Sequence, residues 1–189
     1  MFDISVMRPV FSTAKGTLLG YTMSITHLPD VGGIGFGAAA SEIYHEGLRL
    51  PIVKLAESGV INEFLLDLIA VNVRTPESTI GDLRANIACN EVGGRQLVEF
   101  LNEYAIDDLS ALSNAIRNQS ELAMREKIKD IRNGTYDNSI LIEAIDEPIT
   151  LTCKVEVEDE KIEIDCDGTG GCVSRGINVP FCYTNAMSL

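Results

Sequence analysis

The sequence predicts an α+β fold: a mixed sheet with hairpins at both ends of the chain and a helical segment between them. Polar and apolar residues alternate over 154–165, which is the period of a strand with one face in water. Between residues 61 and 131 apolar residues recur with the period of amphipathic helices. We therefore divide the chain into strands with a glycine-rich loop (1–59), a helical part (60–135) and β-hairpins (136–189).

The first hairpin is predicted from two apolar and β-branched runs, residues 4–11 and 17–26, on either side of a turn at 12–16. In such a hairpin the first residue of one strand lies opposite the last residue of the other. Asp3 is therefore expected beside His27. The loop that follows contains four glycines between residues 32 and 37.

The central part is predicted to begin with a helix over residues 61–73. Thr79 and Asp82 have the spacing of a capping box, which predicts that a second helix starts there. Gly93 and Gly94 fall inside this second helix. Because each glycine costs about 1 kcal/mol relative to alanine in a helix, the pair indicates either a close contact or a break.

A third, amphipathic helix is predicted after Asp107-Asp108, with Asn133-Gly134 as its C-terminal cap. The pattern then changes to a period of two. Val155 and Val157, followed by a turn around Asp159 and then by the run 162–164, predict a hairpin with one face in water.

Charge and composition exclude several classes of protein. The net charge is −13, whereas a nucleic-acid-binding protein needs a basic face. The longest apolar run, residues 64–73, contains Asp67 and is too short to span a bilayer, and the N-terminus lacks the pattern of a secretory signal. The five cysteines are odd in number and form no CxxC pair, which favours free thiols in a reducing cytoplasm.

His27 and Asp30 are the first candidate site. They stand three residues apart after a predicted strand, and Asp3 arrives from the neighbouring strand. Imidazole and carboxylates that converge from different segments are ligands for a divalent metal. The alternative is a capped or hydrogen-bonded turn. Arg74 is either a ligand for a carboxylate or phosphate group or one half of a buried ion pair.

We predict no nucleotide-binding residues. Residues 33–38 fit the loose dinucleotide pattern G-x-G-x-x-A, but no second βαβ unit follows and no Walker A lysine motif occurs. The chain also lacks a Gly-x-Ser-x-Gly nucleophile elbow, so serine-hydrolase chemistry is not expected.

Further segments follow in order: Glu46–Leu55, Asn72–Pro76, Gly81–Ala88, Asp165–Thr169 and Gly176–Pro180. Together with the run 26–37, in this order and at this spacing, they resemble the hydantoinase B/oxoprolinase family. The resemblance extends from residue 3 to about residue 184. Residues 1–6 are similar to a His-Leu-Pro-Asp run of the family without its leading histidine, so the sequence resembles an internal fragment of a larger hydantoinase B-like domain. Leu28 stands where the family more often has a second histidine.

The resemblance implies part of an ATP-dependent hydrolase acting on the C–N bonds of cyclic amides, of the hydantoinase or oxoprolinase type. In that family this half carries a divalent metal (Zn, Mn or Mg), and ATP is used by a hydantoinase A-type partner subunit or domain in a hetero-oligomer. Asp3 and His27 are implied as metal ligands, and His27 and Asp30 as catalytic residues. The implied substrate loop, whose backbone the cyclic amide approaches, contains Gly32, Gly33 and Gly35.

Two alternatives stay open. The first is a catalytically inactive, truncated module with a structural or interaction role. The second is a subunit of a related ATP-dependent ketone carboxylase, since acetone carboxylases belong to the same family.

Overall fold

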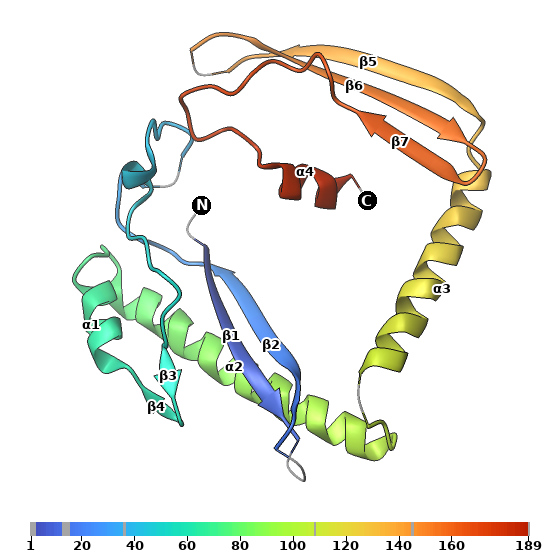
Figure 1. Ribbon diagram of the computed structural model, residues 1–189. Helices are drawn as coiled ribbons and strands as arrows, with labels where there is room; N and C mark the ends of the chain where they lie inside the picture. The colour runs from blue at the N-terminus through green and yellow to red at the C-terminus, as the bar shows by residue number, and fades with distance from the viewer. Residues whose placement is uncertain (1–2, 13–15, 36, 108, 145, 189) are drawn as a thin grey trace. The chain divides into compact units, whose positions relative to one another are not determined.

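The computed structural model describes residues 3–12, 16–35, 37–107, 109–144 and 146–188 (Figure 1). The chain divides into two compact units, residues 1–109 and residues 110–189, and this division falls inside the part predicted to be helical. Helices and antiparallel strands make up both units, so the α+β class is confirmed. The described strands form three separate antiparallel sheets and not one mixed sheet, because each strand pairs with a neighbour in sequence.

The first unit begins with a hairpin of β1 (Asp3–Phe11) and β2 (Leu18–His27). Asp3 lies directly opposite His27, which confirms the predicted register. Residues 13–15 of the predicted turn lie outside the described residues.

The glycine-rich loop leads from the hairpin to a short 3₁₀ helix and then to the remaining elements of the first unit. In order, these elements are η1 (Ile43–Glu46), β3 (Ala56–Glu57), β4 (Val60–Ile61), α1 (Glu63–Ala70) and α2 (Pro76–Glu103). The core joins the loop to the two helices and contains Leu28, Val31, Leu65, Leu66, Ile69 and Leu83.

Helix α2 starts earlier than the sequence pattern predicts. Its first residue is Pro76, and Thr75 occupies the N-cap position. Proline suits the first helical turn because its missing N–H has no partner there in any case. The predicted capping box of Thr79 and Asp82 is therefore wrong, and the buried Thr79 hydroxyl instead donates to the Asp30 carbonyl at 3.3 Å.

Gly93 and Gly94 mark a close contact and not a break. Helix α2 is continuous across them and runs along the hairpin (Figure 1). A Cβ on Gly93 would lie 3.3 Å from Thr22 Cγ2, and a Cβ on Gly94 would lie 3.2 Å from Val10 Cγ2. The absent side chains therefore let the hairpin approach the helix.

The second unit contains α3 (Ser110–Lys129) and a sheet in the order β5–β6–β7. The strands are β5 (Gly134–Ile142), β6 (Ile149–Glu158) and β7 (Lys161–Asp165), and the short helix α4 (Phe181–Met187) follows. The predicted hairpin with its turn at Asp159 is confirmed as β6–β7.

The predicted helix cap at Asn133-Gly134 is wrong. Helix α3 ends at Lys129, and Gly134 is the first residue of β5. The Asn133 side chain is used differently: its oxygen accepts from the Asp159 amide at 2.9 Å, and its amide donates to the Asp159 carboxylate at 3.1 Å. The Asn133 side chain therefore holds the start of β5 against the turn between β6 and β7.

Within the part of the chain that the structure describes, no helix is both long enough and apolar enough to cross a membrane.

Candidate functional site

The end of the hairpin brings two predicted ligands together. Asp3 opens β1 and His27 closes β2, and the antiparallel register places them opposite each other. His27 Nδ1 and Asp3 Oδ1 form a hydrogen bond. The His27 side chain is 77% exposed and that of Asp3 32% exposed, so both are open to a ligand.

One imidazole nitrogen and one carboxylate oxygen are suitable donors for a divalent metal such as Zn²⁺ or Mn²⁺. Metal ligands of these types bind in their deprotonated forms, so an ion would replace the hydrogen bond between Asp3 and His27. Among the described residues, no group of three or more His, Cys, Asp and Glu side chains converges as a metal site. The pair therefore fits a metal but supplies only part of a coordination sphere.

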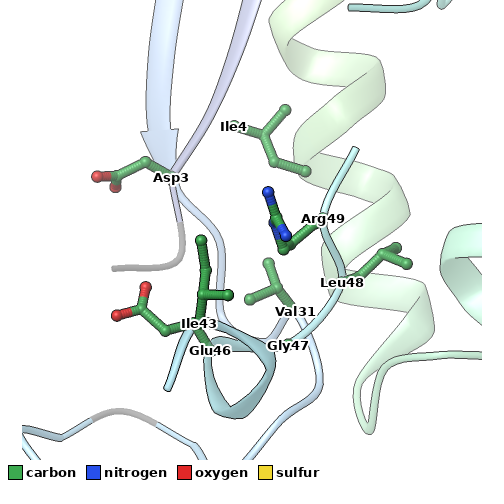
Figure 2. Close-up of a pocket in the computed structure, with 8 residues that line it drawn as sticks. All are labelled: Asp3, Ile4, Val31, Ile43, Glu46, Gly47, Leu48 and Arg49. Carbon is green, nitrogen blue, oxygen red and sulfur yellow. The ribbon is translucent and has the colours of Figure 1, made fainter. Parts of the chain in front are cut away.

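A cavity of about 180 Å³ lies next to this pair, and Asp3 is part of its wall. The other lining residues are Ile4, Val31, Ile43, Glu46, Gly47, Leu48 and Arg49. In Figure 2 the Asp3 and Glu46 carboxylates point to the same side, and the Arg49 guanidinium lies between Ile4 and Val31. The residues that line the cavity are thus mostly apolar, with two acidic residues and one basic residue among them.

Sequence reasoning did not identify this cavity. Arg49 stood out only as a member of the motif 46–55, which carries no chemical signature by itself, and Glu46 as one of two glutamates around His45 that suggest either a general base or a solvated helix face. The Arg49 guanidinium also lies 6.0 Å from the centre of the Tyr44 ring, a distance at which a cation is attracted by the ring face.

Asp30 does not line the cavity. It is buried, and its Oδ1 accepts hydrogen bonds from the Gly32 amide at 3.0 Å and from the Arg74 guanidinium at 2.8 Å. Its Oδ2 accepts from the Arg74 backbone amide. That backbone hydrogen bond is the main cause that lowers the pKa of Asp30, and burial opposes it. Of the two interpretations offered for Arg74, the structure shows the ion pair.

Two glycines of the predicted substrate loop lie close to the backbone of other segments of the protein. Gly32 and Gly33 have φ values of 82° and 66°, which side chains rarely adopt. A Cβ on Gly32 would lie 2.7 Å from the Asn72 carbonyl oxygen, and one on Gly33 would lie 2.3 Å from that of His45. Gly35 also has a positive φ, of 94°, but no atom lies within 4 Å of the place that its Cβ would occupy.

The loop is thereby fastened to the segment that lines the cavity. The Ile34 amide donates to the His45 carbonyl at 3.0 Å, and the Leu48 amide donates to the Val31 carbonyl at 2.7 Å. Gly32 and Gly33 are required for this packing, and their role toward a substrate stays a prediction.

Comparison with known proteins gives a family match over the whole chain. The family described as hydantoinase B/oxoprolinase matches residues 1–189. The putative B-type subunit of a D-/L-hydantoinase from Pseudomonas sp. (strain NS671) is 29% identical over 194 aligned positions, which cover 96% of this chain and 32% of that protein.

The beta chain of the caprolactamase of Pseudomonas jessenii is 31% identical over 87% of this chain and 29% of its own length. In the crystal structure of that ATP-dependent caprolactamase, the matching region has a TM-score of 0.75 and covers 86% of this chain and 29% of the caprolactamase chain. A nucleotide-free acetone carboxylase shares the fold, with a TM-score of 0.78 at 18% identity over 92% of this chain and 25% of its own. The chain spans about a third of the length of the hydantoinase and caprolactamase subunits.

Proposed function

The chain belongs to the hydantoinase B/oxoprolinase family, and from this we propose that it is the metal-binding part of an ATP-dependent cyclic amide hydrolase. Its partner in this proposal is a hydantoinase A-type, ATP-using subunit or domain. Two relatives are named as single subunits, one of a hydantoinase and one of a caprolactamase, which supports a hetero-oligomer that acts on cyclic amides. The five free cysteines are consistent with a cytoplasmic location.

The contact between the Asp3 carboxylate and the His27 imidazole is the observation that carries the proposal. Asp3 belongs both to this pair and to the wall of the cavity. A group held by the pair would therefore stand beside a molecule in the cavity.

In the proposed reaction each side chain has a separate task. A divalent metal, when bound, polarises a ring carbonyl or lowers the pKa of water. His27 supplies the nitrogen donor and Asp3 the oxygen donor. The apolar residues that line the cavity would receive the carbon atoms of a ring.

Asp30, predicted as catalytic, is proposed to act at a distance by holding the loop. Its hydrogen bonds to Gly32 and Arg74 fix the turn that follows His27. This turn leads into Val31, whose carbonyl is bonded to Leu48 in the cavity wall. Asp30 would thus hold the end of β2, which carries His27, at a fixed position relative to the cavity.

A module without catalysis of its own is the second candidate function. It is favoured by the fact that the described residues offer a metal two ligands, whereas metal sites in proteins normally use at least three. The similarity to an acetone carboxylase concerns the fold alone and does not favour a ketone carboxylase.

A metal titration distinguishes the two functions. Co²⁺ or Mn²⁺ is added to the purified chain and to the variants Asp3→Asn and His27→Gln, and the affinity is measured by calorimetry. Loss of either ligand should weaken binding at least about tenfold. Both side chains are at the exposed end of the hairpin, so the melting temperature should change little.

His45→Gln is the matched control. His45 is the other histidine of the chain, and it also faces a carboxylate, with its Nε2 3.3 Å from Glu42 Oε1. Its loss should leave the metal affinity unchanged. Equal affinity in all four proteins would reject Asp3 and His27 as ligands and leave the non-catalytic module as the better description.

A further inference from the structure

Both faces of the first hairpin carry apolar side chains. The face toward α2 has the polar residues Thr22, Ser24 and Thr26, together with Val10, which is buried and lies against Gly94 of the helix. The other face carries large apolar side chains that are more than half exposed: Met7 60%, Met23 53% and Ile25 61%. Because both faces offer apolar side chains, apolar burial alone does not decide which face meets the helix.

Two asparagines of α2 distinguish the two faces. Asn86 and Asn90 are both buried and stand four residues apart, so they lie on the same side of the helix. The Asn86 side-chain amide donates to the Thr26 hydroxyl at 2.6 Å. The Asn90 amide donates to the Ser24 hydroxyl at 2.8 Å and to the Val6 carbonyl at 3.0 Å.

The Asn90 backbone completes these contacts by accepting from the Thr22 hydroxyl at 2.9 Å. Among the described residues, no buried side-chain nitrogen or oxygen lacks a hydrogen-bond partner. A hairpin that turned the face of Met7, Met23 and Ile25 to the helix would leave both asparagines buried without partners, which destabilises the fold. The asparagines therefore favour the face that carries the three hydroxyl groups.

The face of the hairpin that meets α2 also determines on which side of the hairpin the Asp3 and His27 side chains lie. Side chains alternate between the two faces of a strand, so His27 and its neighbour Thr26 lie on opposite faces. We propose that Asn86 and Asn90 are positioning residues, whose hydrogen bonds determine which face of the hairpin meets α2 and thereby hold Asp3 and His27 on the outer face. The metal-binding consequence rests on the proposed function, whereas the choice of face does not.

The first experiment needs no metal. The methyl groups of Met7 and Met23 are labelled with ¹³C, and their exposure is measured by NMR with a soluble paramagnetic probe. In Asn86→Leu/Asn90→Leu no buried amide excludes the face of Met7 and Met23 from the helix, so this face should meet α2 and relaxation of both methyls by the probe should fall at least about twofold. Met124, which is exposed on α3 in the second unit, is the internal reference. Unchanged exposure of Met7 and Met23 in the folded variant would overturn the proposal.

The second experiment separates positioning from simple stabilisation and covers the case in which the double leucine variant does not fold. Asn86→Leu alone leaves the Thr26 hydroxyl unpaired, whereas Asn86→Leu/Thr26→Val removes both partners and should restore the melting temperature. If Asn86 positions the ligand strand, Co²⁺ affinity stays at least about tenfold weaker in the restored double variant. If the contact only stabilises the fold, affinity returns together with the melting temperature, and the proposal fails.

A failure of the proposal about Asn86 and Asn90 can be distinguished from a failure of the proposed function. A wild-type chain that binds no Co²⁺ contradicts the metal site, and the exposure of Met7 and Met23 then decides the role of the asparagines by itself. Asp3→Asn shows whether any Co²⁺ observed is bound at the hairpin end.

Discussion

The Asp30 carboxylate lies near the candidate site, but its observed role is to accept hydrogen bonds from backbone amides. Its two oxygens accept from Gly32 and Arg74, and it is buried while its partner guanidinium reaches solvent. The spacing from His27 suggested a shared ligand set. In the structure Asp30 holds the loop, because Arg74, 44 residues along the chain, lies beside it, and a catalytic role of Asp30 stays a prediction.

We expect Asp30→Asn to lower the free energy of unfolding by about 1–3 kcal/mol at neutral pH, since hydrogen bonds to a charged acceptor are lost. The pKa of Asp30 is lowered in the folded state. Such a carboxylate stabilises the fold above its unfolded pKa of about 3.9, and the contribution disappears as the pH falls through the folded value. The stability difference between wild type and variant should therefore be greatest near neutral pH and should shrink below about pH 4.

Urea titrations between pH 3 and pH 7 measure this difference, and Asp67→Asn is the control. Asp67 lies on the exposed side of α1 and should show little effect at any of these values. A difference for Asp30→Asn that stayed constant across the range would contradict the assignment of the lowered pKa to this group.

At the scale of elements, α2 combines two kinds of glycine. Gly81 has open space around the position of a Cβ, so Gly81→Ala should raise the free energy of unfolding by about 1 kcal/mol through helix propensity. Gly94→Ala should gain less or should destabilise, because its Cβ would press on Val10 Cγ2 at 3.2 Å. Thermal melts of the two variants measure the contribution of the hairpin contact. Equal gains at both positions would show that the hairpin does not constrain the helix.

The sequence predicted elements where the signal is local. The register of Asp3 with His27 follows from two alternating strands and a short turn, and the helical period was sufficient to find α1, α2 and α3. The two wrong boundaries have a common cause. Thr79 and Asn133 look like helix caps, but their side chains bond to Asp30 and Asp159, which are distant in sequence.

The candidate site was predictable only in part for the same reason. A hairpin brings Asp3 and His27 together by local geometry. The cavity forms where β1, the loop and the segment 43–49 meet, and no pattern within any one of these segments specifies the others. The asparagines of α2 were likewise not recognised, because a buried Asn cannot be told from an exposed one by helical period.

At the scale of the whole molecule, the charge and the motifs argue against nucleotide binding by this chain alone. The chain has a net charge of −13 and no Walker A lysine loop to hold polyphosphate. We expect calorimetry to detect no micromolar binding of ATP·Mg²⁺ to the isolated chain. An ATP-using family partner, titrated under the same conditions, provides the positive control. A micromolar dissociation constant for the chain alone would refute the assignment of ATP to a partner.

The asparagine contacts also have a consequence for the order of folding. Asn86 and Asn90 lie 60 and 84 positions from the hairpin residues Thr26 and Val6, whereas Asp3 and His27 are only 24 positions apart. Local strand pairs form within microseconds, but contacts between distant segments must wait for larger loops to close. On a ribosome the hairpin is also synthesised before the helix that orients it. We therefore expect Asp3 and His27 to come together early, before either face of the hairpin has packed on a helix. The site should be complete only after α2 has packed against the hairpin.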